Sequence, residues 1–315
     1  MQRTSSILFF VALGALGCKP AVGRAPSLIV GPEILAVRGD PAEVSPGVDV
    51  SYQFLVASTT GTVTDAQGTW DLCTQPKPPS ESNSVASACV NAPPGTDVGA
   101  TFTAAAPPDA CSLFGPNAPA AKAGQPPFRP RDPDITGGYY VPVRLLVDDG
   151  SGTSNTLMAF DFERVFCGLG GAPLAAIQDY NTRYKKNTNP TLQGLAIVAL
   201  DGTRTDILAS AGTVTSGTVV ALVASASPDS AETFPVYDSV AQVLNDQVET
   251  LSVSWFASDG KFKDDRVDAD AVSFEANDTW TAPQVTASET IPVWVVLRDT
   301  RGGVAFASTS LNVVP

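Results

Sequence analysis

Residues 291–306 read IPVWVVLRDTRGGVAF, and this stretch decides the fold class. Its first half is an apolar, β-branched run in which Val293, Val295 and Leu297 alternate with the side chains between them, the two-residue period of a β-strand. Residues 299–303, DTRGG, supply the Asp and Gly residues that tolerate positive φ in a chain reversal. A second short apolar run follows. The stretch therefore predicts a β-hairpin.

The same pattern occurs earlier in the chain. Residues 141–160 read VPVRLLVDDGSGTSNTLMAF, with a similar Pro-Val entry, an Asp-containing Gly-rich turn and an Ala-Phe exit. Trp70 and Trp255 stand in short apolar runs before the two hairpins, where they predict the core anchor of a central strand. More residues separate Trp70 from the hairpin that follows it than separate Trp255 from its own hairpin. The first copy therefore carries an insertion at about residues 74–138. Two copies predict two related β domains.

The remaining pattern predicts short strands separated by turns, which favours β-sandwiches. The predicted organisation is a first domain at 31–167, a linker at 168–192 and a second domain at 193–315. Residues 173–184 have one apolar stripe and predict a short helix, packed on a neighbouring domain or, as the alternative, bound to a partner. Residues 228–245 are interpreted as an acidic loop.

Composition bounds the function. The chain has 315 residues, 43% of them hydrophobic, enough for two domains that each bury a core. Its formal charge of −13 excludes electrostatic binding to nucleic acid, which needs a basic surface. The sequence contains no histidine, which removes Ser-His-Asp and Cys-His catalysis and His-ligated zinc. Chemistry based on paired carboxylates stays open, but no catalytic residue is assigned, and we expect a protein without enzymatic activity.

Residues 1–17 have Arg3 followed by an apolar stretch of about ten residues, which is too short to span a bilayer and predicts a secretion signal. Ala15-Leu16-Gly17-Cys18 resembles the lipobox of bacterial lipoproteins. That resemblance implies that Cys18 is lipidated, palmitate being one of the acyl groups, and becomes the mature N-terminus. Residues 18–30 would then form the tether. The alternative is an ordinary signal peptide with an incidental cysteine.

Four further cysteines, an even number on an exported chain, predict two disulfides, and their pairing stays open: Cys73, Cys89, Cys111 and Cys167. Zinc is the alternative, but their spacing includes no Cys-x-x-Cys pair.

Residues 259–270, DGKFKDDRVDAD, form the densest run of acids. A calcium loop is one interpretation, because calcium takes about six to eight oxygen ligands, with these candidates: Asp259, Asp264, Asp265, Asp268 and Asp270. The run does not have EF-hand spacing, and basic residues are interleaved with the acids, so we favour a solvated loop and assign neither a metal nor a cofactor.

The insertion ends in a charged and aromatic stretch that is a candidate binding surface, with these residues: Arg129, Arg131, Asp132, Asp134, Tyr139 and Tyr140. The favoured alternative is that they brace the insertion on the sheet.

The lipobox and the paired hairpins together resemble the tandem Ig-like cell-envelope lipoproteins of myxobacteria and related Gram-negative bacteria. The resemblance implies two Ig-like β-sandwiches and an outer-membrane anchor, and it transfers no catalytic residues. We therefore expect a non-enzymatic structural or binding module whose partners are the membrane, through the lipid, and envelope proteins or glycans. The alternatives are a carbohydrate-binding accessory protein, a carboxylate-based hydrolase and a calcium-stiffened stalk.

Overall fold

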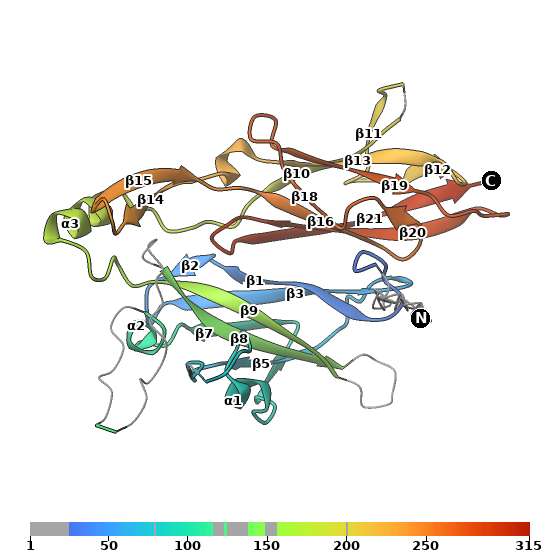
Figure 1. Cartoon of the computed structure of the whole chain (residues 1–315). Helices are drawn as coiled ribbons and strands as arrows, with labels where there is room; N and C mark the ends of the chain where they lie inside the picture. Colours follow the sequence, from blue (N-terminus) through green and yellow to red (C-terminus); the bar gives the residue numbers. More distant parts are fainter. Residues whose placement is uncertain (1–24, 79, 116–122, 125–137, 149–155, 200) are drawn as a thin grey trace, which may run out of the picture.

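The chain folds almost entirely into β-strands. The structure is a computed structural model that describes residues 25–78, 80–115, 123–124, 138–148, 156–199 and 201–315. In that part of the chain, four sheets of four or five strands form two sandwiches, and one further ribbon has two strands. Figure 1 shows the N-terminal sandwich below the C-terminal one. The prediction of an all-β protein built from Ig-like sandwiches is confirmed.

The N-terminal sandwich encloses a core that includes Tyr52, Trp70 and Leu145. Its first sheet contains β1 (Glu33–Asp40), β3 (Asp49–Ser58), β4 (Gly61–Thr62) and β7 (Thr101–Ala105). Its second sheet runs in the order β2 (Glu43–Val44), β9 (Thr156–Phe166), β8 (Gly138–Asp148), β5 (Gly68–Leu72) and β6 (Asp97–Gly99).

The C-terminal sandwich encloses a core that includes Trp255 and Trp280. Its first sheet runs in the order β11 (Arg204–Asp206), β10 (Leu192–Val198), β13 (Val219–Ala226), β19 (Glu275–Thr281) and β17 (Lys261–Phe262). Its second sheet runs in the order β12 (Gly212–Thr215), β21 (Val304–Val314), β20 (Glu289–Arg298), β16 (Ser252–Ala257) and β18 (Arg266–Asp268).

The sheet that contains β8 and β9 in the N-terminal sandwich has the same arrangement as the sheet that contains β20 and β21 in the C-terminal sandwich. The predicted hairpins are β8–β9 and β20–β21, and in each a short edge strand, β2 or β12, pairs in parallel with the second strand. Trp70 lies opposite Leu145 and Trp255 opposite Val295, so both tryptophans hold the same place beside their hairpins. The hairpin predictions are confirmed, while the exact domain boundaries stay a prediction.

The turn between β20 and β21 depends on its aspartate and glycines. The carboxylate of Asp299 accepts hydrogen bonds from the backbone N–H groups of Arg301 and Gly303, both at 2.8 Å. Gly302 has a φ of +101°, a conformation that costs glycine little. A Cβ atom on Gly303 would lie 2.1 Å from the Asp299 carboxylate. The turn therefore holds Arg301 in a defined position.

Strand β20 is buried on both faces. A typical sandwich strand instead has one face in the core and the other in solvent. Val293 and Val295 belong to the C-terminal core, whereas Trp294 and Val296 face the N-terminal sandwich. All four are 0% exposed. A nearly continuous apolar run is typical of strands covered on both sides, and here an entire sandwich is the second cover.

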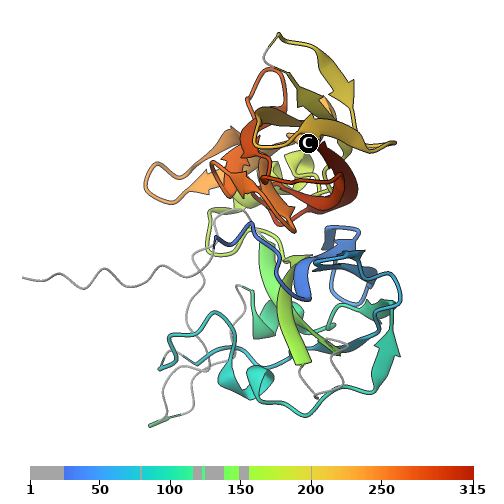
Figure 2. The same ribbon diagram turned by 90° about the vertical axis from the view of Figure 1, so that its right-hand side faces the viewer.

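The two sandwiches pack face to face along an apolar seam. Leu35 and Leu55 from β1 and β3 contact the cluster around Trp294, and Figure 2 shows the same stacking from the end of the molecule. The Trp294 indole donates to Thr62 Oγ1 (2.9 Å). Asn189 bridges the sandwiches, accepting from Val304 N–H (2.9 Å) and donating to the carbonyl of residue 39 (2.7 Å). The seam makes the two sandwiches one packed body.

The first described residues attach to the C-terminal sandwich before the chain enters β1. Ile29 N–H donates to the Ala257 carbonyl, and Ala257 N–H donates to the Ser27 carbonyl, both at 2.9 Å. The eight residues of β1 then extend about 26 Å, at about 3.3 Å per residue. The chain thus enters near the end of β16, and β1 leads to the opposite end of the seam.

Residues 228–245, predicted as an acidic loop, instead contain the short helix η1 (Pro228–Ser230) and most of the ribbon β14 (Thr233–Asp238) and β15 (Val243–Val248). Pro235 argues against a central strand, but a two-stranded ribbon tolerates it. Helix α3 (Leu174–Arg183) lies within the predicted helical range and packs its Tyr180 against this ribbon. Within the described ranges, no helix is long and apolar enough to cross a bilayer.

The insertion at about residues 74–138 contains regular structure, although its sequence shows no clear hydrophobic periodicity. β7 pairs with β3 and β6 pairs with β5, while α1 (Ser87–Val90) and α2 (Ala110–Leu113) are single turns. The β7 sequence TFTAA has one large apolar residue, Phe102, among threonines and alanines, so its hydrophobic signal is too small to find.

Candidate functional site

The candidate calcium residues do not gather. All five aspartates, Asp259, Asp264, Asp265, Asp268 and Asp270, are exposed, and no group of three or more acidic or cysteine side chains suited to a metal lies in the described residues. Asp270 instead accepts from the backbone N–H groups of Val272 and Ser273, which lowers the pKa of its carboxyl. These acids act as turn and surface residues.

The candidate surface of the insertion is only partly described. Arg129, Arg131, Asp132 and Asp134 lie outside the described residues. Tyr139 is buried and Tyr140 is half-buried, and as neighbours on β8 their side chains point to opposite faces of the sheet. The Tyr140 hydroxyl accepts from Arg164 Nη1 (2.9 Å), and the guanidinium lies 5.4 Å from the centre of its ring.

A buried charged cluster closes the seam at the end where β1 finishes. We call it the seam cluster, and it consists of Glu43, Arg164, Tyr184, Glu232, Glu249 and Arg301. The turn between β20 and β21 carries Arg301, and the two residues flanking the ribbon β14–β15 are Glu232 and Glu249. Arg301 Nε donates to Glu249 Oε1 (2.6 Å) and Nη2 to Glu232 Oε2 (2.5 Å). Arg301 is 2% exposed.

The N-terminal sandwich contributes the other half of the seam cluster. Glu43 Oε2 accepts from the Tyr184 hydroxyl (2.6 Å) and from the Asn187 N–H (2.8 Å), and lies 3.4 Å from Arg164 Nε. Arg301 Nη1 donates to the Tyr184 hydroxyl (3.3 Å), and the Arg301 Cζ atom lies over the Phe234 ring, 4.7 Å from its centre. Buried charges need such partners, because removing one leaves the other desolvated and unpaired.

Two further acids, Asp161 and Glu163, lie on β9 beside β1. Burial raises the pKa of Asp161 to about 6, and burial together with the charge of Asp161 raises the pKa of Glu163 to about 9. Burial, followed by the charge of Asp299, also raises the pKa of Glu249 to about 7, although Arg301 opposes the shift. These raised pKa values arise inside a packed seam.

None of the seam cluster was identified from the sequence. Its members lie far apart along the chain, and a single Glu or Arg in a short strand or turn has no motif. One signal was present: Glu43 and Arg164 lie next to apolar strand positions, where a charged side chain needs a buried partner.

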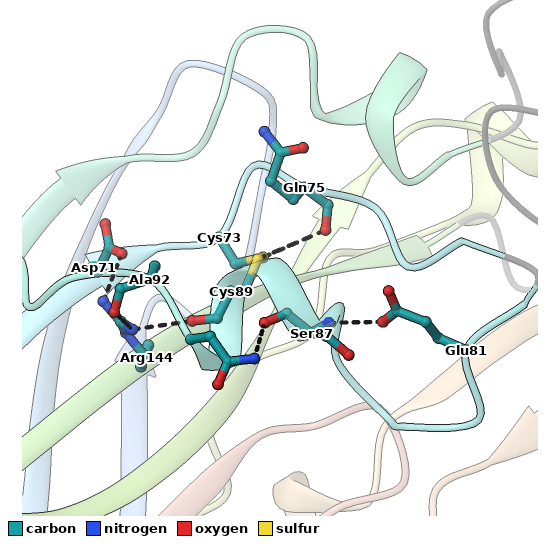
Figure 3. The surroundings of a disulfide bond; sticks show 9 residues. Asp71, Cys73, Gln75, Glu81, Ser87, Cys89, Ala92 and Arg144 are labelled. Carbon is teal, nitrogen blue, oxygen red and sulfur yellow. Dashed lines mark hydrogen bonds and ion pairs between the residues drawn. A yellow bond between two sulfur atoms is a disulfide. The ribbon is translucent and has the colours of Figure 1, made fainter.

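The first disulfide, Cys73–Cys89, fixes part of the insertion against the outer face of β8 (Figure 3). We call residues 73–78 and 80–95 the flap. Arg144 of β8, 2% exposed, donates to the carbonyls of Cys89 (3.0 Å) and Ala92 (2.7 Å) and pairs with Asp71 (3.1 Å). Three of its four partners are backbone carbonyls, the third being that of residue 93 (2.5 Å). The arginine and the disulfide both hold the flap, and both act on Cys89.

The second disulfide, Cys111–Cys167, joins α2 to the residue that follows β9. Both predicted disulfides are therefore present, and the structure decides their pairing. All four cysteines are consumed, so the zinc alternative is wrong.

Replacing Cys73 and Cys89 together by alanine is expected to lower the free energy of unfolding by about 3 kcal/mol, because the bond closes a loop between residues 16 apart. Urea denaturation of the oxidised proteins measures this difference. The exposed flap substitution Ser82→Ala is the control and should change stability by less than about 0.5 kcal/mol. Equal stability of the double variant and the wild type would show that Arg144 alone holds the flap.

A cavity of about 380 Å³ lies between the flap, α2 and the outer face of β8–β9. We call it the flap cavity. Its apolar wall has six residues: Val85, Ala86, Phe114, Tyr140, Pro142 and Phe162. Gln75, Lys77 and Ser84 of the flap complete the lining, which includes no carboxylate among the described residues. This size and mainly apolar character are typical of small-molecule sites, which span about 300–1,000 Å³.

The arrangement separates two roles. Asp161, Glu163 and Glu249, whose pKa values are raised, lie in the seam, and none of them lines the flap cavity. The flap cavity offers ring surfaces and one ammonium group, and its described lining contains no carboxylate.

No protein-family model and no curated protein matches the sequence. Solved structures give distant similarities. A nucleoside hydrolase-related hypothetical protein from Saccharophagus degradans, associated with carbohydrate metabolism, is 15% identical over 49% of this chain and 34% of its own, with a TM-score of 0.23. The adhesin InvE of Yersinia pseudotuberculosis is 8% identical over 88% of this chain and 58% of its own, with a TM-score of 0.23. The chain thus covers less than two thirds of either protein.

Proposed function

We propose that this protein is a non-enzymatic binding or structural module of the cell envelope, anchored in the outer membrane through a lipid on Cys18. The observation that carries the proposal is the seam. Its apolar contacts and seam cluster hold the two sandwiches face to face, and the buried carboxylates of the cluster pair with Arg164 and Arg301. Because the two sandwiches are fixed relative to each other, they can present one rigid surface to a partner.

The entry of the chain gives the anchored body a direction. The predicted tether at 18–30 is bound to the body through Ser27 and Ile29, both of which pair with Ala257 at the end of β16. The seam cluster lies at the other end of β1, and Tyr140 of the flap cavity contacts Arg164 of that cluster. A lipid on Cys18 would therefore keep the Ala257 end near the membrane and direct the flap cavity and the ribbon β14–β15 away from it.

Replacing Cys18 by serine tests the anchor. The wild-type protein is expected to incorporate labelled palmitate and to pellet with the outer membrane, and the Cys18→Ser variant to lose both the label and the membrane association. Ala21→Ser in the same segment is the matched control and should keep both. A wild-type protein that carries no label would overturn the anchor while leaving the fold unaffected.

Crosslinking in the native envelope tests the binding role. A photo-crosslinking residue at Val240, which is 93% exposed at the tip of the ribbon β14–β15, is expected to capture envelope proteins or glycans. The same residue at exposed Glu289, the first residue of β20, is the control for the end near the tether. Capture at Glu289 and none at Val240 would contradict the proposed direction.

A further inference from the structure

We propose that the flap cavity binds a small amphipathic anion, a molecule with a flat or chain-like apolar body and one acidic group. This inference rests on the proposed binding function and specifies its ligand. The argument uses the shape of the wall, the charge of the lining and the way in which the surrounding chain is held.

The wall of the flap cavity presents ring surfaces from three elements. Phe162 comes from β9, Tyr140 and Pro142 from β8, and Phe114 follows α2. Phe162 remains 37% exposed, although the flap covers much of this face of the sheet. The cavity is open to solvent, so its ring surfaces are accessible to a ligand. A flat or chain-like apolar body would cover these surfaces and recover the packing contacts that the empty cavity lacks.

The charge of the lining indicates that the ligand carries an acidic group beside its apolar body. Lys77 is the sole charged residue among the nine that line the flap cavity, while Gln75 and Ser84 add neutral polar groups. The chain as a whole has a formal charge of −13, so its surface repels anions in general. A lysine beside an apolar wall pairs with a carboxylate, sulfonate or phosphate at its edge. A neutral ligand would use this residue only as a hydrogen-bond donor and would leave its charge unpaired.

The site is formed before a ligand arrives. The Cys73–Cys89 disulfide and the bonds of Arg144 hold the flap, and the Tyr140 hydroxyl accepts from Arg164 of the seam cluster. A wall fixed by buried bonds needs little ordering when it binds, which reduces the entropic cost. The site also lies at the end of the body away from the tether, where a ligand reaches it.

Two fluorescent probes test the proposal. 8-Anilinonaphthalene-1-sulfonate has an aromatic body and one negative charge, and N-phenyl-1-naphthylamine has nearly the same body without charge. Both are titrated into the full chain carrying Cys18→Ser, so that no detergent or lipid is needed. Lys77→Gln is expected to weaken binding of the sulfonate probe by about fivefold, as for loss of one partly exposed ion pair, and to leave the neutral probe unchanged.

Two filling variants locate the binding. Val85→Trp places an indole inside the flap cavity, and Ser84→Trp places one at its exposed rim without disturbing the core. Both are expected to reduce binding of the two probes at least tenfold. Lys261→Gln on β17 and Val98→Trp on β6 are matched controls outside the flap cavity, and neither should change either Kd. The melting temperature of each variant reports whether it is folded.

The outcomes separate the parts of the proposal. Unchanged binding of both probes in folded Ser84→Trp protein overturns the site. Loss of both probes in the Trp variants, with no effect of Lys77→Gln on the sulfonate probe, overturns the anionic ligand. Neither result affects the palmitate label or the envelope crosslinks, so failure of this inference is distinguishable from failure of the proposed function.

Discussion

Replacing Arg301 by methionine is expected to lower the free energy of unfolding by about 3–5 kcal/mol, the usual cost of removing one partner from a buried ion pair. Methionine keeps much of the length of the side chain but removes the guanidinium. Glu249, whose side chain is 0% exposed, would then lose its partner at 2.6 Å. Glu232 would lose its bond as well, and the turn of the hairpin would no longer be held to the ribbon β14–β15. Urea denaturation measures the loss.

The matched control is Arg204→Met. Arg204 pairs with Glu275 at 2.6 Å, the same distance as the pair of Arg301 and Glu249, but its side chain is 45% exposed. Water screens that pair, so its loss should cost less than about 1 kcal/mol. The comparison holds residue type and distance constant and varies burial. A similar small loss in both variants would mean that the seam cluster does not hold the sandwiches together.

Stability is also expected to fall as the pH rises from about 4.5 to about 9. The Glu163 carboxyl has an ordinary pKa of 4.5, which the folded protein raises to about 9 through burial and the charge of Asp161. Below 4.5 the carboxyl is protonated in the folded and unfolded chain alike, so its contribution does not change with pH. Between the two values the unfolded chain has released the proton while the folded chain keeps it. The group therefore lowers the free energy of unfolding by about 1.4 kcal/mol for each pH unit in this window.

Glu163→Gln isolates this effect, because glutamine resembles the protonated carboxyl and does not titrate. The stability of the variant relative to the wild type should grow by about 1.4 kcal/mol per pH unit from pH 5 to pH 9, measured by urea denaturation at each pH. Asp161, with its pKa raised from 3.8 to about 6, adds its own slope below pH 6 in both proteins. Glu289→Gln, at an exposed site, should run parallel to the wild type. Parallel curves for Glu163→Gln and the wild type would show that Glu163 is ionised in the fold.

The packing of the seam keeps Glu163 away from solvent and from any substrate. A hydrolase based on carboxylates needs an acid with a raised pKa beside a substrate, but Glu163 is 2% exposed and packs against β1. The lining of the flap cavity has no acid among the described residues. Glu163 and Glu249 therefore bear on stability and on the fixed arrangement of the two sandwiches. The ligand site that we propose in the flap cavity does not depend on these acids.

Local patterns in the sequence predicted the local structure. The two hairpins, the anchoring tryptophans Trp70 and Trp255, and the presence of two disulfides all follow from alternation, turn residues and the cysteine count. Each of these signals is contained within a few neighbouring residues, or in the composition of the chain. The ribbon β14–β15 was missed because Pro235 and the acids around it argue for a loop when the partner strand is unknown.

By itself the sequence determined that this chain forms β-sandwiches with repeated hairpins, because hydrophobic alternation and turn chemistry act between near neighbours. Only the tertiary structure decided that the sandwiches stack face to face, since the pairing of Trp294 with Thr62 or of Arg301 with Glu249 joins residues far apart in the chain. It likewise decided the disulfide pairing and the flap cavity. The physical reason is that burial is a property of what covers a side chain, and for β20 and Arg301 that cover comes from distant parts of the chain.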